Sequence, residues 1–144
     1  MRLYLLLSAL IVLATPAVAR APQENSVVTA LTDSAAGWNE GKIGRFMAIY
    51  SDAPETSFVT AEGLVRGKSK MAARYREKFS FDDPDKRGKL SFKTLDFRLL
   101  DATHALYIGQ YLLTYSSGKS ATGPTSLVFA KEKTGWKIIA DHSS

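Results

Sequence analysis

The chain has 144 residues, a formal net charge of +5 and 45% hydrophobic residues, and it contains no cysteine. The lack of cysteine excludes disulfides, thiolate metal sites, iron–sulfur clusters and a thiol nucleophile. Because the lysines and arginines are spread along the chain, we expect no continuous basic stripe of the kind that binds nucleic acid.

The first 19 residues have the pattern of a secretory signal peptide. Arg2 supplies a positive start, residues 3–13 are almost wholly apolar, and Ala17-Val18-Ala19 forms a small-residue cleavage site. The apolar stretch is too short to be a spanning helix. We therefore predict cleavage after Ala19 and a secreted or periplasmic protein, with no membrane anchor once the peptide is removed.

The remainder is predicted to be a polar leader, residues 20–25, followed by one domain over residues 26–144. That length suits a single hydrophobic core. Apolar residues at helical spacing predict a first helix over residues 26–39, which Gly41 can end in a left-handed conformation. A short second helix is predicted over residues 43–49.

Two short strands and a third helix come next. The strands are predicted at residues 56–60 and 64–66, and the helix begins after Gly67. Its predicted buried ridge has four-residue spacing and consists of Met71, Tyr75 and Phe79. Residues 82–89 contain no apolar side chain and are predicted to be a loop.

The last third of the chain is predicted to be sheet. Alternating residues separated by turn clusters indicate four strands, at residues 90–100, 104–115, 125–131 and 136–143, with a Ser/Gly/Pro loop at 116–124. Short turns between them favour an antiparallel meander. Helices followed by a sheet indicate an α+β fold in which a curved sheet packs on N-terminal helices.

The final strand carries one histidine beside an apolar row. Strict alternation places Trp136, Ile138, Ala140 and His142 on one face and Asp141 on the other. His142 is then either the polar handle of a pocket or a hydrogen-bonded core residue, and the sequence leaves both open. Asp141 cannot orient the imidazole directly on this interpretation.

Residues at several places along the chain give it a resemblance to a known fold family. The first helix closes in the segment 38–42 (Trp-Asn-Glu-Gly-Lys), Gly63 and Gly67 bracket a short hairpin, and the chain finishes with the strand of residues 135–144. The chain resembles the nuclear transport factor 2-like superfamily over about residues 24–144. It is most similar to SnoaL-like and ketosteroid-isomerase-like proteins of unassigned function, and the calmodulin-dependent kinase association domain ends similarly. The resemblance implies a cone-shaped, cystatin-like roll with a pocket at its open end, and a homodimer formed through the sheet.

The resemblance does not extend to the catalytic residues of the isomerases. Ketosteroid isomerases use an aspartate base with an oxyanion hole made of a tyrosine and a protonated aspartic acid. The three matching positions hold other residues: Ser34, Phe58 or Val59, and Ser126 or its neighbours. Because phenylalanine cannot accept a proton, we do not expect isomerase chemistry by that route. If the match slips by a few residues, Asp52 or Glu55 would be the nearby replacement base.

The candidate pocket residues are one histidine and six aromatic residues: His142, Trp38, Tyr50, Phe58, Tyr75, Tyr107 and Tyr111. They suit an apolar cavity with hydroxyl groups at its rim, and ordinary core packing is the alternative for the aromatic residues. Asp96 and Arg98 share a predicted strand face with Phe92 and Thr94. They could either line the pocket or form a charged patch on the dimer surface, and the sequence leaves both positions open. No catalytic residue is assigned, and no metal or cofactor is expected.

The sequence supports two functions. The first is an exported protein that binds a small apolar or aromatic molecule, with His142 as polar anchor and Trp38 in the pocket wall; isomerase, lyase or cyclase activity is left open. The second is a non-catalytic dimeric interaction module whose pocket is vestigial and whose sheet face binds a protein partner.

Overall fold

The computed structural model describes residues 21–144, so the predicted signal peptide lies outside the described residues. In chain order the elements are α1 (Pro22–Asn39), α2 (Ile43–Met47), β1 (Ser57–Thr60), β2 (Gly63–Arg66), α3 (Lys68–Phe79), α4 (Pro84–Arg87), β3 (Lys89–Leu99), β4 (His104–Thr114), β5 (Ser120–Glu132) and β6 (Gly135–Ser143). Within this part of the chain, no helix is long and apolar enough to cross a membrane.

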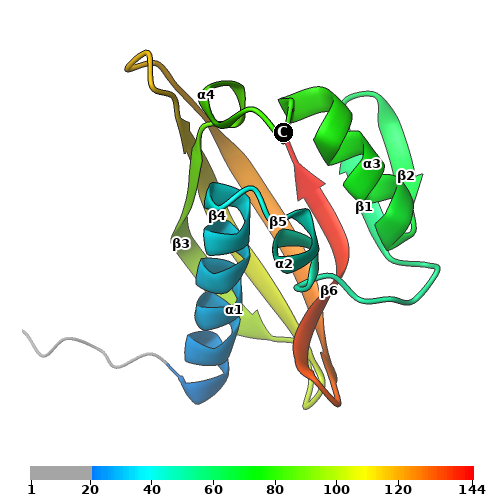
Figure 1. The fold of residues 1–144 in the computed structure, drawn as a ribbon. Coiled ribbons are helices and arrows are strands. Elements are labelled where there is room, and N and C mark those ends of the chain that lie inside the picture. Colours follow the sequence, from blue (N-terminus) through cyan, green and yellow to red (C-terminus); the bar gives the residue numbers. More distant parts are fainter. Residues whose placement is uncertain (1–20) are drawn as a thin grey trace, which may run out of the picture.

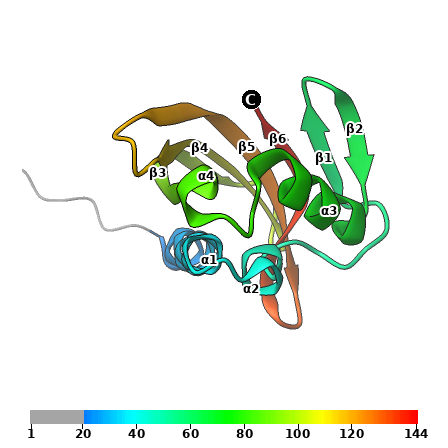
Figure 2. The ribbon, with the colours of Figure 1, turned by 45° about the horizontal axis from the view of Figure 1, so that its top comes forward.

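One curved six-stranded sheet forms the frame of the domain, in the order β2-β1-β6-β5-β4-β3. Strands β3 to β6 form the predicted antiparallel meander. Strand β1 pairs with β6 in parallel, which the sequence did not predict, and so joins the β1–β2 hairpin to the end of the sheet. Helices α1, α2 and α3 lie on one side of the sheet (Figures 1 and 2), which confirms the predicted α+β fold.

The segment that closes α1 holds the core together. Trp38 is 2% exposed, and its ring makes edge contacts with Phe46, Phe79 and Phe81 at centroid distances of 5.0–5.2 Å. Its indole Nε1–H donates to the carbonyl of Gly88 at 3.2 Å. These contacts fix the end of α1 against the start of the sheet and the helices beside it.

The structure differs most from prediction at three places along the chain, and the other boundaries agree to within about two residues. α1 begins at Pro22, inside the predicted polar leader, because proline suits the first turn of a helix. The predicted loop 82–89 contains α4, whose first turn is capped by the Asp83 carboxylate. β5 begins at Ser120, since pairing with β4 carries the ladder into a stretch of turn-forming residues.

A β-bulge in β6 changes which side chains face the helices. Ile138 pairs with Phe129 and Ala140 pairs with Val128, so Ile139 is the extra residue. One extra residue moves every later side chain to the opposite face. Trp136 and Ile138, before the bulge, are buried as predicted, but after it Asp141 is buried and His142 is exposed on the outer face. The alternation predicted for this strand is therefore wrong beyond Ile139.

A second bulge, at Leu95 in β3, has the same effect. The register shifts between Thr94 and Asp96. Asp96 and Arg98 consequently lie on the exposed outer face, where the Arg98 Nε and the Asp96 Oδ2 form an ion pair of 2.8 Å. The predicted shared face with Phe92 and Thr94 is wrong, and neither charged residue lines the pocket described below.

The close approach of α1 and α2 yields a testable requirement for glycine. A Cβ atom at Gly37 would lie 2.5 Å from the backbone nitrogen of Phe46, whereas a Cβ at Gly44 would meet nothing within 4 Å. We expect Gly37→Ala to lower the free energy of unfolding by about 1–3 kcal/mol, because backbone must shift to admit the methyl group. The matched control Gly44→Ala should be neutral or stabilising by up to about 1 kcal/mol. Urea unfolding of both variants tests this, and equal effects would contradict it.

Candidate functional site

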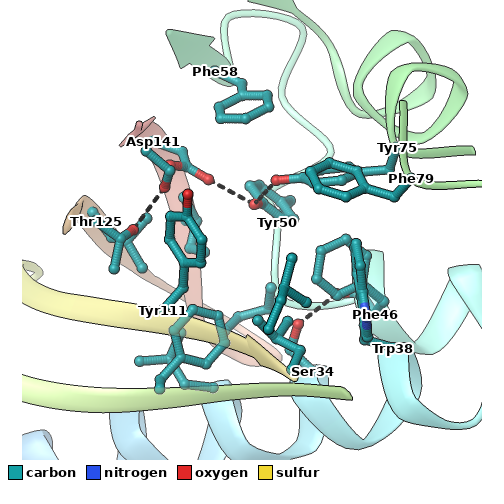
Figure 3. A pocket seen from close by; sticks show the side chains of 18 residues that line it. Ser34, Trp38, Phe46, Tyr50, Phe58, Tyr75, Phe79, Tyr111, Thr125 and Asp141 are labelled. Atoms are coloured by element: carbon teal, nitrogen blue, oxygen red, sulfur yellow. Dashed lines mark hydrogen bonds between the residues drawn. The ribbon is translucent and has the colours of Figure 1, made fainter. Parts of the chain in front are cut away.

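A cavity of about 120 Å³ lies between the sheet and helices α1 to α3 (Figure 3). Its wall is mostly aromatic, and the aromatic residues are Trp38, Phe46, Tyr50, Phe58, Tyr75, Phe79, Phe92 and Tyr111. An engineered protein cavity of about 150 Å³ holds benzene, so this volume suits a single-ring molecule. The half-buried lining residues Phe79, Phe92, Tyr111 and Ser143 mark the side on which the cavity approaches the surface.

The polar side of the cavity is built around the carboxyl group of Asp141, which is 4% exposed. The Tyr50 hydroxyl donates to Asp141 Oδ2 at 2.7 Å, and the Ser143 hydroxyl donates to Oδ1 at 2.7 Å. Tyr75 extends the chain on one side, 3.2 Å from the Tyr50 hydroxyl, and Thr125 extends it on the other, 2.8 Å from Ser143 (Figure 3). We call these five side chains the Asp141 network.

Non-local pairing places the members of the network. The bulge at Ile139 turns Asp141 inward, opposite Phe58 of β1 and Leu127 of β5. Tyr50 follows α2 and forms an isolated parallel bridge with Ile138 of β6, which holds its ring beside the strand. α3 contributes Tyr75 from the other side of the cavity (Figure 3).

Burial sets the protonation of the network. Desolvation raises the pKa of Asp141 above its ordinary 3.8, although the hydrogen bonds from Ser143 and Tyr50 oppose the rise. Burial also raises the pKa values of Tyr50 and Tyr75, and the negative charge of Asp141 adds to both shifts. Both phenols therefore keep their protons at neutral pH, and Asp141 takes up a proton more readily than an exposed carboxyl group does.

The arrangement suits hydrogen bonding to a ligand, with one titratable carboxyl group at the cavity wall. Among residues 21–144, no three His, Asp or Glu side chains lie close enough together to hold a metal ion. Asp141 is the one charged residue among those that line the cavity. A carboxyl group with hydroxyl partners can bind a hydroxyl or carbonyl group, and it can also give or take a proton.

Five of the seven predicted pocket residues line the cavity: Trp38, Tyr50, Phe58, Tyr75 and Tyr111. Tyr107 is fully buried and instead borders a separate groove between α1 and β3. His142 is exposed on the outer face of the sheet, so neither the predicted pocket position nor the predicted core position describes it. The neighbouring Asp141 occupies the inward position. A lone acid in an apolar strand was its only sequence signal, and strict alternation assigned it to the wrong face.

The positions matched to the isomerase machinery lie partly in the cavity. Ser34 and Phe58 line it, and the Ser34 hydroxyl donates to the backbone carbonyl of Phe46 at 2.8 Å. Ser126 is exposed, while its neighbour Thr125 faces inward. The replacement bases considered from the sequence, Asp52 and Glu55, are both exposed and outside the cavity.

Comparison with solved structures shows the nuclear transport factor 2-like fold. A protein of this fold and of unknown function from Shewanella oneidensis superposes with a TM-score of 0.77 at 23% identity, over 84% of this chain and 98% of that one. A domain of unknown function with a cystatin-like fold from Nostoc punctiforme gives 0.72 at 20% identity, over 88% and 78% of the two chains. A putative calcium/calmodulin-dependent protein kinase type II association domain from Thiobacillus denitrificans gives 0.65 at 19% identity, over 80% and 90%.

Sequence comparison adds nothing to this result. No protein-family model matches the chain, and no curated protein matches it. Because these structural similarities lie below 25% identity, they show the fold alone, and the fold hosts many unrelated functions.

The raised pKa of Asp141 predicts a specific dependence of stability on pH. The folded protein binds this proton more tightly than the unfolded chain does, so the contribution is present at low pH and is lost as pH rises from the ordinary value through the raised pKa. We expect the free energy of unfolding of the wild type to fall by up to about 1.4 kcal/mol per pH unit in that window, relative to Asp141→Asn.

Urea unfolding across a pH series measures this difference. Asp96→Asn, on the exposed outer face, controls for replacing a carboxyl group by an amide. A difference between wild type and Asp141→Asn that stays constant with pH would contradict the assignment.

Proposed function

We propose that this chain is an exported protein that binds a small, mostly aromatic molecule carrying one polar group. The cavity supports the proposal, because an apolar space closed on one side by convergent polar groups is the usual form of a small-molecule site. The Asp141 network supplies the polar groups. Export is supported by the signal-peptide pattern of residues 1–19.

The buried carboxyl group carries the argument. A protein that needed only a stable core would gain by replacing Asp141 with an apolar residue, because burying a polar group costs free energy that its hydrogen bonds only partly offset. Keeping this group on the wall of a cavity is understandable if a ligand uses it. The same carboxyl group is the site at which an isomerase or lyase activity would place its proton transfer.

Ligand-induced stabilisation tests the proposal. Toluene or phenol at about ten times its Kd should stabilise the folded protein by about 1.4 kcal/mol and raise the Tm by a few degrees. Leu127→Phe should abolish the shift by filling the cavity next to Asp141. His142→Ala, on the outer face, should keep it and is the matched control. If no small aromatic molecule shifts the Tm of the wild type, ligand binding is excluded as the role of this cavity.

We also propose that the chain forms a homodimer through the outer face of the sheet. Half-buried apolar side chains on β4, β5 and β6 support this: Leu106, Ile108, Val128, Ile139 and Ala140. Leu112, on the same face of β4, is 40% exposed. A group of apolar side chains on the outer face of a sheet is typical of an interface. The alternative function, an interaction module with a vestigial pocket, would use this same face.

Light scattering of the chain from residue 20 onward tests the dimer. We expect the mass of two chains at micromolar concentration, and Ile108→Glu should give the mass of one chain because it buries a charge in the interface. The control Ala73→Glu changes an exposed residue of α3, remote from the sheet face, and should leave the dimer intact. A monomeric wild type would contradict the proposal.

A further inference from the structure

The Asp141 network has a property that follows from counting its protons. It contains four hydrogen-bonded contacts: Tyr75 with Tyr50, Tyr50 with Asp141, Asp141 with Ser143, and Ser143 with Thr125. It also contains four hydroxyl groups, each with one proton to donate. When Asp141 is a carboxylate it contributes no proton, so the four hydroxyl protons are just enough for the four contacts.

The ionised network therefore has a fixed direction. Tyr50 and Ser143 must both donate to Asp141, which has only lone pairs. Tyr50 can then only accept from Tyr75, and Ser143 can only accept from Thr125. Every hydroxyl proton of the network is donated to another member of the network. A ligand can therefore only donate hydrogen bonds to it, because the network offers lone pairs and no free proton.

The other polar hydrogens that line the cavity are committed as well. The hydroxyl groups of Ser34 and Tyr111 and the indole N–H of Trp38 each donate to a main-chain oxygen atom. Among the described residues that line the cavity, no side-chain donor is thus left over for a ligand carbonyl when Asp141 is ionised.

Protonation of Asp141 changes the count from four protons to five. If the new proton lies on Oδ2 and is donated to Tyr50, the Tyr50 proton turns to Tyr75 and the Tyr75 hydroxyl is released. If it lies on Oδ1 and is donated to Ser143, the Thr125 hydroxyl is released by the same reversal. In either case one donor becomes free at the cavity wall.

We propose that the proton on Asp141 selects the class of ligand that the cavity binds. The ionised site takes a molecule that donates a hydrogen bond, such as an aromatic alcohol or phenol. The neutral site takes a molecule that only accepts one, such as an aromatic carbonyl compound or nitrile. This inference rests on the proposed ligand-binding function. It adds that the protonation state of Asp141 determines whether the site binds a hydrogen-bond donor or an acceptor.

The surroundings of Asp141 move this titration to a higher pH than that of an exposed carboxyl group. Burial raises the pKa of Asp141. The groups around it are the hydroxyls of Tyr50 and Ser143, the Tyr75 hydroxyl beyond Tyr50, and the apolar side chains of Phe58 and Leu127 on the neighbouring strands. The adjacent His142 is on the opposite face, and a positive charge on it favours the carboxylate.

Three probes of similar size separate the two ligand classes. Phenol donates a hydrogen bond, benzonitrile only accepts one, and toluene does neither. Phenol keeps its proton below about pH 8, because its hydroxyl group ionises only near the value for tyrosine, about 10. Their affinities for the chain from residue 20 onward are measured by calorimetry between about pH 4 and pH 8.

We expect the affinity for benzonitrile to fall about tenfold or more as pH rises, since an unpaired acceptor in an apolar site is costly. The affinity for phenol should rise over the same window, because a hydrogen bond to a carboxylate is stronger than one to a neutral acid. Toluene should bind equally well throughout. If toluene binds but the phenol-to-benzonitrile ratio stays constant with pH, the inference is overturned while the cavity function stands. If none of the three binds, both are overturned.

Two variants test the proton count itself. Asp141→Asn holds the same number of protons at every pH, so its phenol-to-benzonitrile ratio should not change with pH. Ser143→Ala removes the acceptor of the Thr125 proton and frees that hydroxyl while Asp141 is still ionised. It should therefore regain benzonitrile binding at the upper end of the pH range. Loss of benzonitrile binding in Ser143→Ala equal to that in the wild type would overturn the inference even if Asp141→Asn fails to fold.

Discussion

Burial of the Asp141 carboxyl group is the constraint on which the rest of the site depends. A carboxyl group can be kept away from water only if its oxygens are hydrogen-bonded, and Tyr50 and Ser143 meet that need at 2.7 Å each. Tyr50 is held by its bridge to β6, and Ser143 lies on the same strand two residues further on. The carboxyl group thus ties the end of the sheet to the segment after α2, and the aromatic cavity lies against that junction.

The nuclear transport factor 2-like fold explains why such a site can exist here. A curved sheet with helices across one side leaves space that side chains fill only partly, and the size of the residues decides whether a cavity is left. Trp38 packs against Phe46 and Phe79 at the end of α1 and forms part of the apolar wall, whereas Thr125 and Ser143 line the polar side. The fold determines where the cavity lies, and the residues that line it determine which chemical groups it can bind.

Much of the architecture follows from local sequence patterns. In the predicted ridge of α3, Met71 and Tyr75 are buried and Phe79 is half-buried. The meander of β3 to β6 forms as the turn clusters indicate. Five of the seven predicted pocket residues line the cavity because large aromatic side chains on inward-facing positions meet there. The parallel pairing of β1 with β6 was not predictable, since it joins segments about eighty residues apart with no local signal.

The sequence by itself determined the α+β class, the order of the strands and longer helices, and the aromatic character of the interior. These features depend on periodicity and turn residues within short stretches of the chain. Only the tertiary structure decided that Asp141, and not His142, faces the cavity. That choice depends on one extra residue, Ile139, left over when Ile138 pairs with Phe129 and Ala140 with Val128. Register between distant strands is a property of the assembled sheet, and a shift of one residue reverses every side chain that follows.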